Sequence, residues 1–279
     1  MFYIPFIGAL ALGLSTLLEK ITLRNKKILP NHFIVALFLS AVIVMAPFVY
    51  FFSQIQSQAL QPLNILLFIG IVIFSILANL LSFYALKWEK LTNLEPIRLL
   101  EPLFVVLLAF AFFRSERNPA VIIPSIIAAL ALVFSHIKKH HLDFNKYIFA
   151  GIIGSLFYAV ELILTKIILP YYNPLTLYFI RCLIIFIVTA IIFHPNLIKE
   201  LNKKEKLLVL LIGTFWVIFR IATYYGYLYL GVVSTTLVLM LGPVFIYIFA
   251  RIFLKEKLTW RNIVATIIIV GCVLYAVLS

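Results

Sequence analysis

Charged side chains are scarce in this chain. Only 12% of its 279 residues are Asp, Glu, Lys or Arg, and 65% are hydrophobic, whereas soluble domains carry about 25% charged residues. A water-soluble protein of this size cannot absorb so large an apolar excess, because its core has too little volume to hide it. The composition therefore excludes an ordinary soluble domain and indicates a membrane protein.

Several chemical signatures are also missing. The sequence has no G-x-x-x-x-G-K-[ST] phosphate loop and no H-E-x-x-H or Ser/His/Asp grouping within its apolar segments. We therefore expect neither a nucleotide-driven pump nor an enzyme, and no cofactor. Cys182 and Cys272 lie inside apolar segments and are interpreted as small hydrophobic residues. The cluster of His136, His140 and His141 lacks further ligands at a suitable spacing, so we expect no metal site there.

Ten apolar runs fill most of the sequence. Most of them reach the roughly 17 to 25 residues that a helix needs to cross about 30 Å of hydrocarbon. Backbone polar groups must be satisfied within a segment in lipid, so we predict helices. The first run lacks the basic start and the small-residue cleavage site of a signal peptide, so we expect it to remain as the first helix. The runs lie at about residues 1–22, 31–52, 62–86, 92–113, 119–137, 147–169, 174–193, 207–230, 233–254 and 261–278.

A repeat relates the last three runs of the first five to the last three of the second five. Aligning Pro102 with Pro243 also aligns Ser82 with Thr223 without a gap. Internal repeats of this kind are typical of secondary transporters, in which the binding site lies between two related halves. Five helices in each half is an odd number, so equivalent loops must lie on opposite sides of the membrane.

The fold class that we predict is an all-α integral membrane protein. Its ten transmembrane helices form two inverted five-helix repeats around a central cavity. We expect the first repeat at residues 1–137, a connecting loop at 138–146 and the second repeat at 147–279.

Basic residues are divided unevenly between the loops. The odd-numbered loops carry 16 Lys and Arg residues, whereas the even-numbered loops carry only Arg114, Arg117 and Lys166. The positive-inside rule places the odd-numbered loops in the cytoplasm and both termini outside. We therefore interpret the formal net charge of +13 as basic loop residues that set the orientation of the protein and contact anionic lipids. We expect no nucleic-acid partner.

The repeated segments carry a family resemblance. Residues 102–116 and 243–256 each form an apolar, Leu-rich or Phe-rich segment that ends in Glu and leads into a terminal apolar run, while Lys20 and Lys166 end the first and sixth runs. In these features the whole chain resembles the EamA-like transporters of the drug/metabolite transporter superfamily. The resemblance implies ten helices around a cavity and transport of small metabolites by alternating access. Family members are usually described with both termini in the cytoplasm, opposite to the charge count, so the orientation stays open.

Two charged residues lie where the membrane should be deepest. Arg220 and Glu161 fall near the middle of their runs, where a charge costs about 2.5 to 3.5 kcal/mol on insertion scales, so each must face protein or water. Arg220 aligns with Asn79, which places two polar groups at equivalent depth. Arg220 is interpreted either as a ligand for a substrate anion or as half of a static ion pair. Three roles stay open for Glu161, namely partner of Arg220, ligand of a substrate amine and carrier of a coupled proton.

The run at 92–113 opens with three charged residues. Glu95, Arg98 and Glu101 are spaced three apart, so they lie along one helix face. The second repeat has no charge at the matching positions, which suggests specialisation. Two interpretations stay open: an interfacial ion-pair ladder, or a ladder of which one member, such as Arg98 or Glu101, faces the cavity and reads substrate charge.

Tyr84 and Tyr225 are equivalent in the repeat. Tyr84 follows Asn79 by about one turn, and Tyr225 follows Arg220 by the same distance. A tyrosine ring offers an apolar wall with a polar end. We predict that both line the binding site.

Three other charged residues have less specific interpretations. Arg181, two turns into the run at 174–193, is interpreted as an anchor for lipid or a loop carbonyl, or equally as a substrate ligand. Glu116 and Glu256 end their segments amid basic residues, so we expect salt bridges at the membrane surface.

The function that we predict is secondary transport of a small polar metabolite. Acidic and basic groups together favour an amino acid or related zwitterion, with Arg220 and Arg98 attracting its anionic group. One alternative is a larger cationic metabolite such as S-adenosylmethionine, which some members of the family carry. Another is a non-transporting membrane scaffold or lipid-binding protein. The chain contains both halves, so a monomer suffices, and its Ile, Phe, Lys and Asn content fits an AT-rich bacterial genome and thus a bacterial inner membrane.

Overall fold

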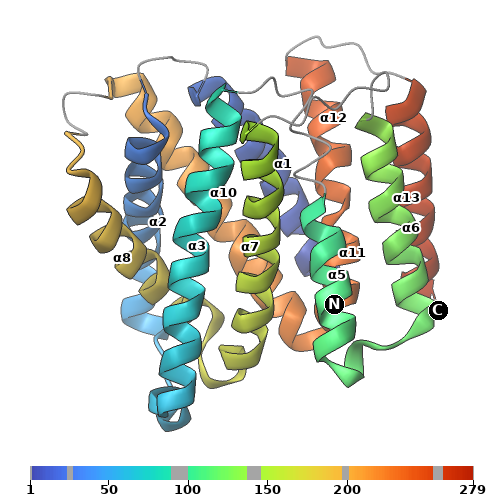
Figure 1. Ribbon diagram of the computed structural model, residues 1–279, viewed down its shortest axis with the longest axis horizontal. Helices are drawn as coiled ribbons and strands as arrows, with labels where there is room; N and C mark the ends of the chain where they lie inside the picture. The colour runs from blue at the N-terminus through green and yellow to red at the C-terminus, as the bar shows by residue number, and fades with distance from the viewer. Residues whose placement is uncertain are drawn as a thin grey trace.

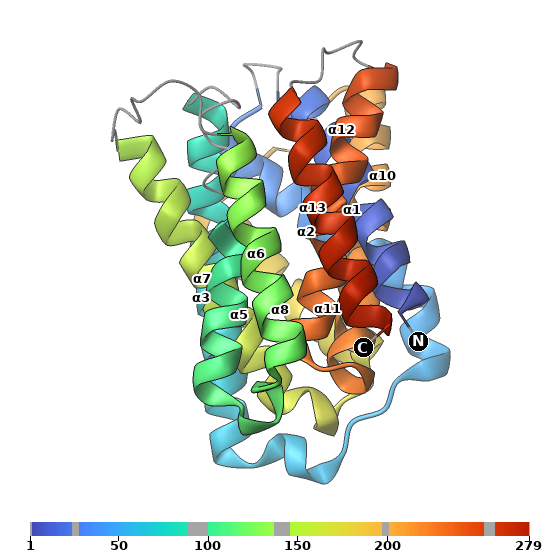
Figure 2. The same cartoon turned by 90° about the vertical axis from the view of Figure 1, so that its right-hand side faces the viewer.

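The computed structural model is a bundle of helices (Figures 1 and 2). It describes residues 2–23, 28–88, 100–136, 146–196, 201–253 and 260–278. Within these ranges seven helical segments are long and apolar enough to cross a membrane, and three shorter apolar helices accompany them. The first half contains α1 (Tyr3–Leu23), α2 (Pro30–Phe52), α3 (Pro62–Trp88), α5 (Leu100–Phe112) and α6 (Pro119–His136). The second contains α7 (Lys146–Ile168), α8 (Pro174–Phe193), α10 (Lys203–Tyr229), α11 (Val232–Leu239), α12 (Leu241–Phe253) and α13 (Trp260–Leu278).

Proline fixes where several of these helices begin. Pro30, Pro62, Pro119 and Pro174 are the first residues of α2, α3, α6 and α8. A proline costs little there, because the first backbone N–H groups of a helix have no partner within it and the fixed φ suits the helix. The prolines therefore mark the boundaries that the apolar runs alone define only roughly.

The segment predicted as one helix at 233–254 is two helices. α11 ends at Leu239, Met240 forms a turn, and α12 begins at Leu241. Pro243 explains the break, because it has no N–H to donate and its ring clashes with the carbonyl four residues earlier, that of Leu239. The two pieces together are still long and apolar enough to cross a membrane, and the break lies beside the cavity described below.

The helices pair in the pattern of two interlocked repeats. α1 packs along α10 and α3 packs along α7, while α2 packs on α8 and α6 on α13. α1 and α7 are equivalent in the two halves, and so are α3 and α10. Exchanging the halves therefore turns the pair α1–α10 into the pair α7–α3, as two inverted repeats require. Glycines permit the closest crossings: a Cβ on Gly154 of α7 would lie 2.9 Å from Ser82 Oγ of α3.

The polarity of the molecule is inverted relative to a soluble protein. Large apolar side chains such as Ile191 and Ile267 are 63% and 65% exposed, whereas Glu161, Arg181 and Asn79 are completely buried. Such an outer surface is stable in lipid and not in water. The protein is therefore an integral membrane protein.

Both ends of the chain lie toward one face of the bundle, the lower one in Figures 1 and 2. The connections at 53–61, 113–118, 169–173 and 230–231 lie at the same face (Figures 1 and 2). We call it the terminus-side face.

Candidate functional site

A cluster of charged side chains lies buried between three helices of the second half. Glu161 of α7 is the centre of the cluster. Its Oε1 lies 2.8 Å from Arg181 Nη1 of α8, and its Oε2 lies 3.5 Å from Arg220 Nη1 of α10. Thr165, one turn along α7, donates its hydroxyl to Oε1 at 3.1 Å. The structure thus brings Glu161 and Arg220 together, as one of the predicted interpretations required, and adds Arg181.

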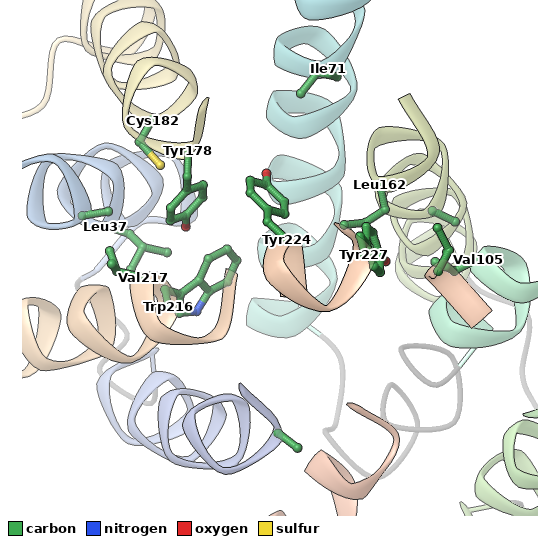
Figure 3. Close-up of a cluster of buried hydrophobic side chains, with 14 of the residues drawn as sticks. Leu37, Ile71, Val105, Leu162, Tyr178, Cys182, Trp216, Val217, Tyr224 and Tyr227 are labelled. Atoms are coloured by element: carbon green, nitrogen blue, oxygen red, sulfur yellow. The ribbon is translucent and has the colours of Figure 1, made fainter. Parts of the chain in front are cut away.

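Arg181 is held on several sides. Besides Glu161, its Nη1 donates to Tyr224 Oη at 2.8 Å and its Nη2 donates to Ser75 Oγ at 2.7 Å. The ring of Tyr178 lies under the guanidinium at 5.6 Å, and the rings of Tyr178 and Tyr224 meet edge to face with centroids 6.0 Å apart (Figure 3). The interpretation of Arg181 as a lipid anchor is wrong, because the residue is completely buried. The hydrogen bonds described for it go to side chains and not to a loop carbonyl.

Arg220 is held more loosely. Its Nε and Nη1 have no hydrogen-bond partner among the described residues, and its contact with Glu161 is a long one. Instead the guanidinium carbon lies 5.5 to 5.9 Å from the ring centroids of Tyr158, Trp216 and Phe219. Aromatic faces attract a cation but leave its N–H groups free to donate. Arg220 therefore keeps donor capacity beside the cavity, whereas both terminal nitrogens of Arg181 donate and its Nε alone lacks a partner among the described residues.

A cavity of about 170 Å³ lies next to Arg220, between the two halves. Its walls come from α1, α3 and α5 of the first half and from α7, α10, α11 and α12 of the second. Two charged residues line it within the described ranges, Arg220 and Glu101. Most of the remaining wall is apolar or aromatic, and it includes Phe83, Tyr158, Trp216, Phe219, Tyr227 and Tyr247.

Asn79 supports the cavity from behind. It is completely buried in α3, its Oδ1 accepts a hydrogen bond from Tyr158 Oη at 2.5 Å, and its Nδ2 donates to the Ser75 carbonyl at 2.8 Å. Tyr158 lines the cavity and flanks Arg220. Asn79 therefore positions a wall residue, whereas its repeat partner Arg220 faces the cavity directly.

The two predicted tyrosines lie away from this cluster. Tyr84 is 38% exposed and packs on Tyr147 with ring centroids 5.3 Å apart. Tyr225 stacks on Tyr229, which is 59% exposed. The tyrosines of α10 that do reach the site are Tyr224 and Tyr227.

Helical spacing could have identified those two tyrosines. Residues four and seven positions after Arg220 share its helix face, whereas the fifth is turned away. Of the predicted ladder, Glu101 lies in the first turn of α5 and lines the cavity. Glu95 and Arg98 lie outside the described residues.

Glu19 is a part of the site that sequence reasoning missed. It lies in α1 with 1% of its surface exposed, and its Oε1 accepts a hydrogen bond from Trp216 Nε1 at 2.5 Å. Trp216 lines the cavity and flanks Arg220. The neighbouring Lys20 made Glu19 look like part of a charged helix end, but an acid still within the first apolar run was a usable signal.

The expected surface salt bridge of Glu116 is wrong. Glu116 is only 8% exposed, and its carboxylate accepts the backbone N–H groups of Val232 and Val233 at 2.7 and 3.1 Å. It therefore caps the first turn of α11. Glu256, its counterpart in the second half, lies outside the described residues.

Comparisons with known proteins agree with this architecture. A solved structure described as "Crystal structure of protein" is similar over 99% of this chain and 96% of its own, with a TM-score of 0.74 and 18% sequence identity, a likeness that shows the fold. No curated protein matches the chain. A model of the EamA-like transporter family matches residues 1–137 and 145–278. Because that model covers both halves, the chain belongs to the EamA-like transporter family, whose members are membrane transporters and not enzymes.

Proposed function

We propose that this transporter moves a small zwitterion, such as an amino acid, by alternating access of the cavity between its two halves. The observation that carries the proposal is that two residues of opposite charge line the cavity, Arg220 from the second half and Glu101 from the first. A positive and a negative group in one cavity match the two ends of a zwitterion. Families built from inverted repeats bind substrate at the interface of the repeats, which is where this cavity lies.

Arg220 is the proposed ligand for the anionic group. It lines the cavity, its Nε and Nη1 have no hydrogen-bond partner within the described ranges, and a guanidinium binds a carboxylate through two parallel hydrogen bonds. The cluster holds two guanidinium groups and one carboxylate, and Arg181 makes the shorter contact with that carboxylate. A substrate carboxylate would add a second negative group next to Arg220.

Glu161 is proposed to act as a fixed counterion. Both of its oxygens face guanidinium groups. Arg181, which contacts Glu161, is itself fixed by hydrogen bonds to Tyr224 and Ser75. We therefore assign the substrate amine to Glu101, in preference to the amine-ligand and proton-carrier roles that the sequence left open for Glu161. Arg181 would keep Glu161 in place when Arg220 turns to the substrate.

The size of the cavity favours a small substrate over S-adenosylmethionine. Its volume of about 170 Å³ is below the roughly 300 to 1,000 Å³ of pockets that take drug-sized ligands. Its largely apolar wall suits an amino acid with an apolar side chain. We also propose that the protein works as a monomer in a bacterial inner membrane, since one chain supplies both halves.

Counterflow uptake into proteoliposomes tests the proposal. Radiolabelled amino acid should accumulate with the wild type, Arg220→Leu should abolish uptake, and Glu101→Gln should weaken it for the amino acid but not for its deaminated analogue. Lys203→Gln, a change at the exposed start of α10, is the matched loss of one positive charge and should have no effect. Uptake by Arg220→Leu at the wild-type rate would refute the site. Failure of all zwitterions to move with the folded wild type would favour a lipid-like substrate or a scaffold.

A further inference from the structure

The elbow between α10 and α11 is held by a residue of the other half of the molecule. Both oxygens of Glu116, which lies in the turn between α5 and α6, accept backbone N–H groups of Val232 and Val233 at the start of α11. Gly231 in the elbow has a φ of +86°, and a Cβ there would lie 2.7 Å from Glu116 Oε1. The carboxylate and the elbow therefore fit together without spare room.

Lys166 holds the other side of the same elbow. Its ammonium group, at the end of α7, donates to the Tyr227 carbonyl in the last turn of α10. It also lies close enough to Glu116 for their opposite charges to attract each other. A cation thus sits at the carbonyl end of α10 and an anion at the N–H end of α11, and each has the sign that its helix end attracts.

The elbow lies next to the cavity, at the terminus-side face. Tyr227 before it and Thr236 after it both line the cavity. Any movement of the elbow must therefore move two cavity walls. Because Glu116 belongs to the first half and the elbow to the second, their contact ties the two halves together at this face.

We propose that Glu116 and Lys166 form a latch that closes the cavity on the terminus-side face, and that its release opens that face during transport. The inference rests on the alternating-access cycle proposed above but not on any particular substrate. When the latch opens, the N–H groups of Val232 and Val233 exchange the Glu116 carboxylate for water. Closing it restores two hydrogen bonds to a charged acceptor, a strong class of hydrogen bond.

A second contact between the halves at this face has a different character. Residues 54–56 pair with residues 171–173 through backbone hydrogen bonds such as Gln56 N–H to the Tyr171 carbonyl. This contact joins the ends of α2 and α8, and neither helix contributes a residue to the described cavity wall. We therefore assign it to the part of the fold that stays together, and the latch to the part that moves.

Cysteine accessibility tests the latch without substrate. In a background with Cys182→Ala and Cys272→Ala, Val233→Cys places a reporter that is 1% exposed behind the latch and keeps the backbone N–H. Adding Glu116→Gln should raise its rate of labelling by a small maleimide about tenfold or more, since the charged acceptor of two hydrogen bonds is lost. Gly231→Ala should raise it too, by steric displacement of the carboxylate, and Lys166→Met by removing the cation.

Glu205→Gln is the matched control. Glu205 also accepts a backbone N–H at a helix start, that of Asn202 at 2.8 Å, but at the opposite end of α10. Its replacement should leave the labelling of Val233→Cys unchanged.

A reporter on the cavity wall separates a latch from local fraying. Thr16 lies on α1 of the first half and lines the cavity, so Thr16→Cys places a second reporter there. Release of a latch should change its labelling at least about twofold, because the halves move relative to each other, whereas fraying of the elbow leaves it unchanged.

Wild-type labelling of Val233→Cys in Glu116→Gln and Gly231→Ala, or an unchanged Thr16→Cys signal, would overturn the proposal. If Glu116→Gln does not fold, Lys166→Met and Gly231→Ala decide by the same criteria. These readouts need no ligand, so they stand even if Arg220 proves not to bind the substrate.

Discussion

The two halves of this transporter share a scaffold but differ in charge. Where α10 carries Arg220 into the cavity, the repeat places Asn79 of α3, which bonds to Tyr158 and stays behind the wall. Where α7 carries Glu161, the alignment of Gly8 with Gly154 places Ser15 of α1, which is also buried but bonds to Leu12 of its own helix. Duplication thus explains the helix pairs, whereas the charged cluster belongs to the second half. The difference suggests that the second half supplies the ligand for the anionic group of the substrate, while the first half completes the cavity and supplies Glu101.

The largest effect should come from removing the charge on which the second half depends. Glu161→Gln leaves Arg181 and Arg220 buried without a counterion, and breaking a buried ion pair costs about 3 to 5 kcal/mol. We expect a matching loss of stability in thermal or denaturant unfolding. Glu161→Gln combined with Arg181→Met should recover part of it. Equal stability of Glu161→Gln and the wild type would mean that the three charges do not form one cluster.

Making the second half resemble the first should abolish transport and spare the fold. Arg220→Asn copies the residue of the first half and removes the proposed anion ligand, so we expect uptake to fall about 100-fold, the effect of about 2.7 kcal/mol. Circular dichroism should show unchanged helix content. Retained uptake would show that the asymmetry between the halves is not functional.

A smaller effect is expected from the first-half partner itself. Asn79→Ala removes the acceptor of the Tyr158 hydroxyl, and the loss of one buried hydrogen bond costs about 0.5 to 1.5 kcal/mol. The unfolding midpoint should drop accordingly, and the apparent affinity for substrate should fall only a few-fold because Arg220 is intact. A loss of uptake as complete as that of Arg220→Asn would contradict the supporting role of Asn79.

The smallest effects should come from Tyr84→Phe and Tyr225→Phe. Both rings lie toward the outside of the bundle, so we expect stability changes within about 0.5 kcal/mol and unchanged uptake. Tyr224→Phe is the informative comparison, because it removes an acceptor of Arg181. Measured unfolding midpoints should separate Tyr224→Phe from the other two variants.

Much of the fold could be predicted from the sequence, because lipid leaves few choices. Apolar runs of membrane-spanning length must be helices, and the Pro102 and Pro243 alignment required two inverted halves. The break at Met240 was missed, although Pro243 carried the signal, because an apolar run records hydrophobicity and not hydrogen bonding.

The site could be predicted only in part. A charge in mid-membrane must have a partner, and that rule led to Arg220 and Glu161. It did not say which helices would meet, and the contact of Arg181 with Glu161 depends on how α8 packs on α2, α3 and α10. Glu116 was misread for the same reason: its position beside Arg114 and Arg117 suggested a salt bridge, but its partners Val232 and Val233 are far away in the sequence.

Ligand-induced stabilisation of the purified protein tests the central claim most directly. An apolar amino acid at 100 times its dissociation constant should stabilise the wild type by about 2.7 kcal/mol. If Arg220 binds the carboxylate, the methyl ester of the same amino acid should stabilise the wild type much less, and Arg220→Asn should respond to neither compound. Equal stabilisation by acid and ester, or an undiminished response of Arg220→Asn to the acid, would contradict the account.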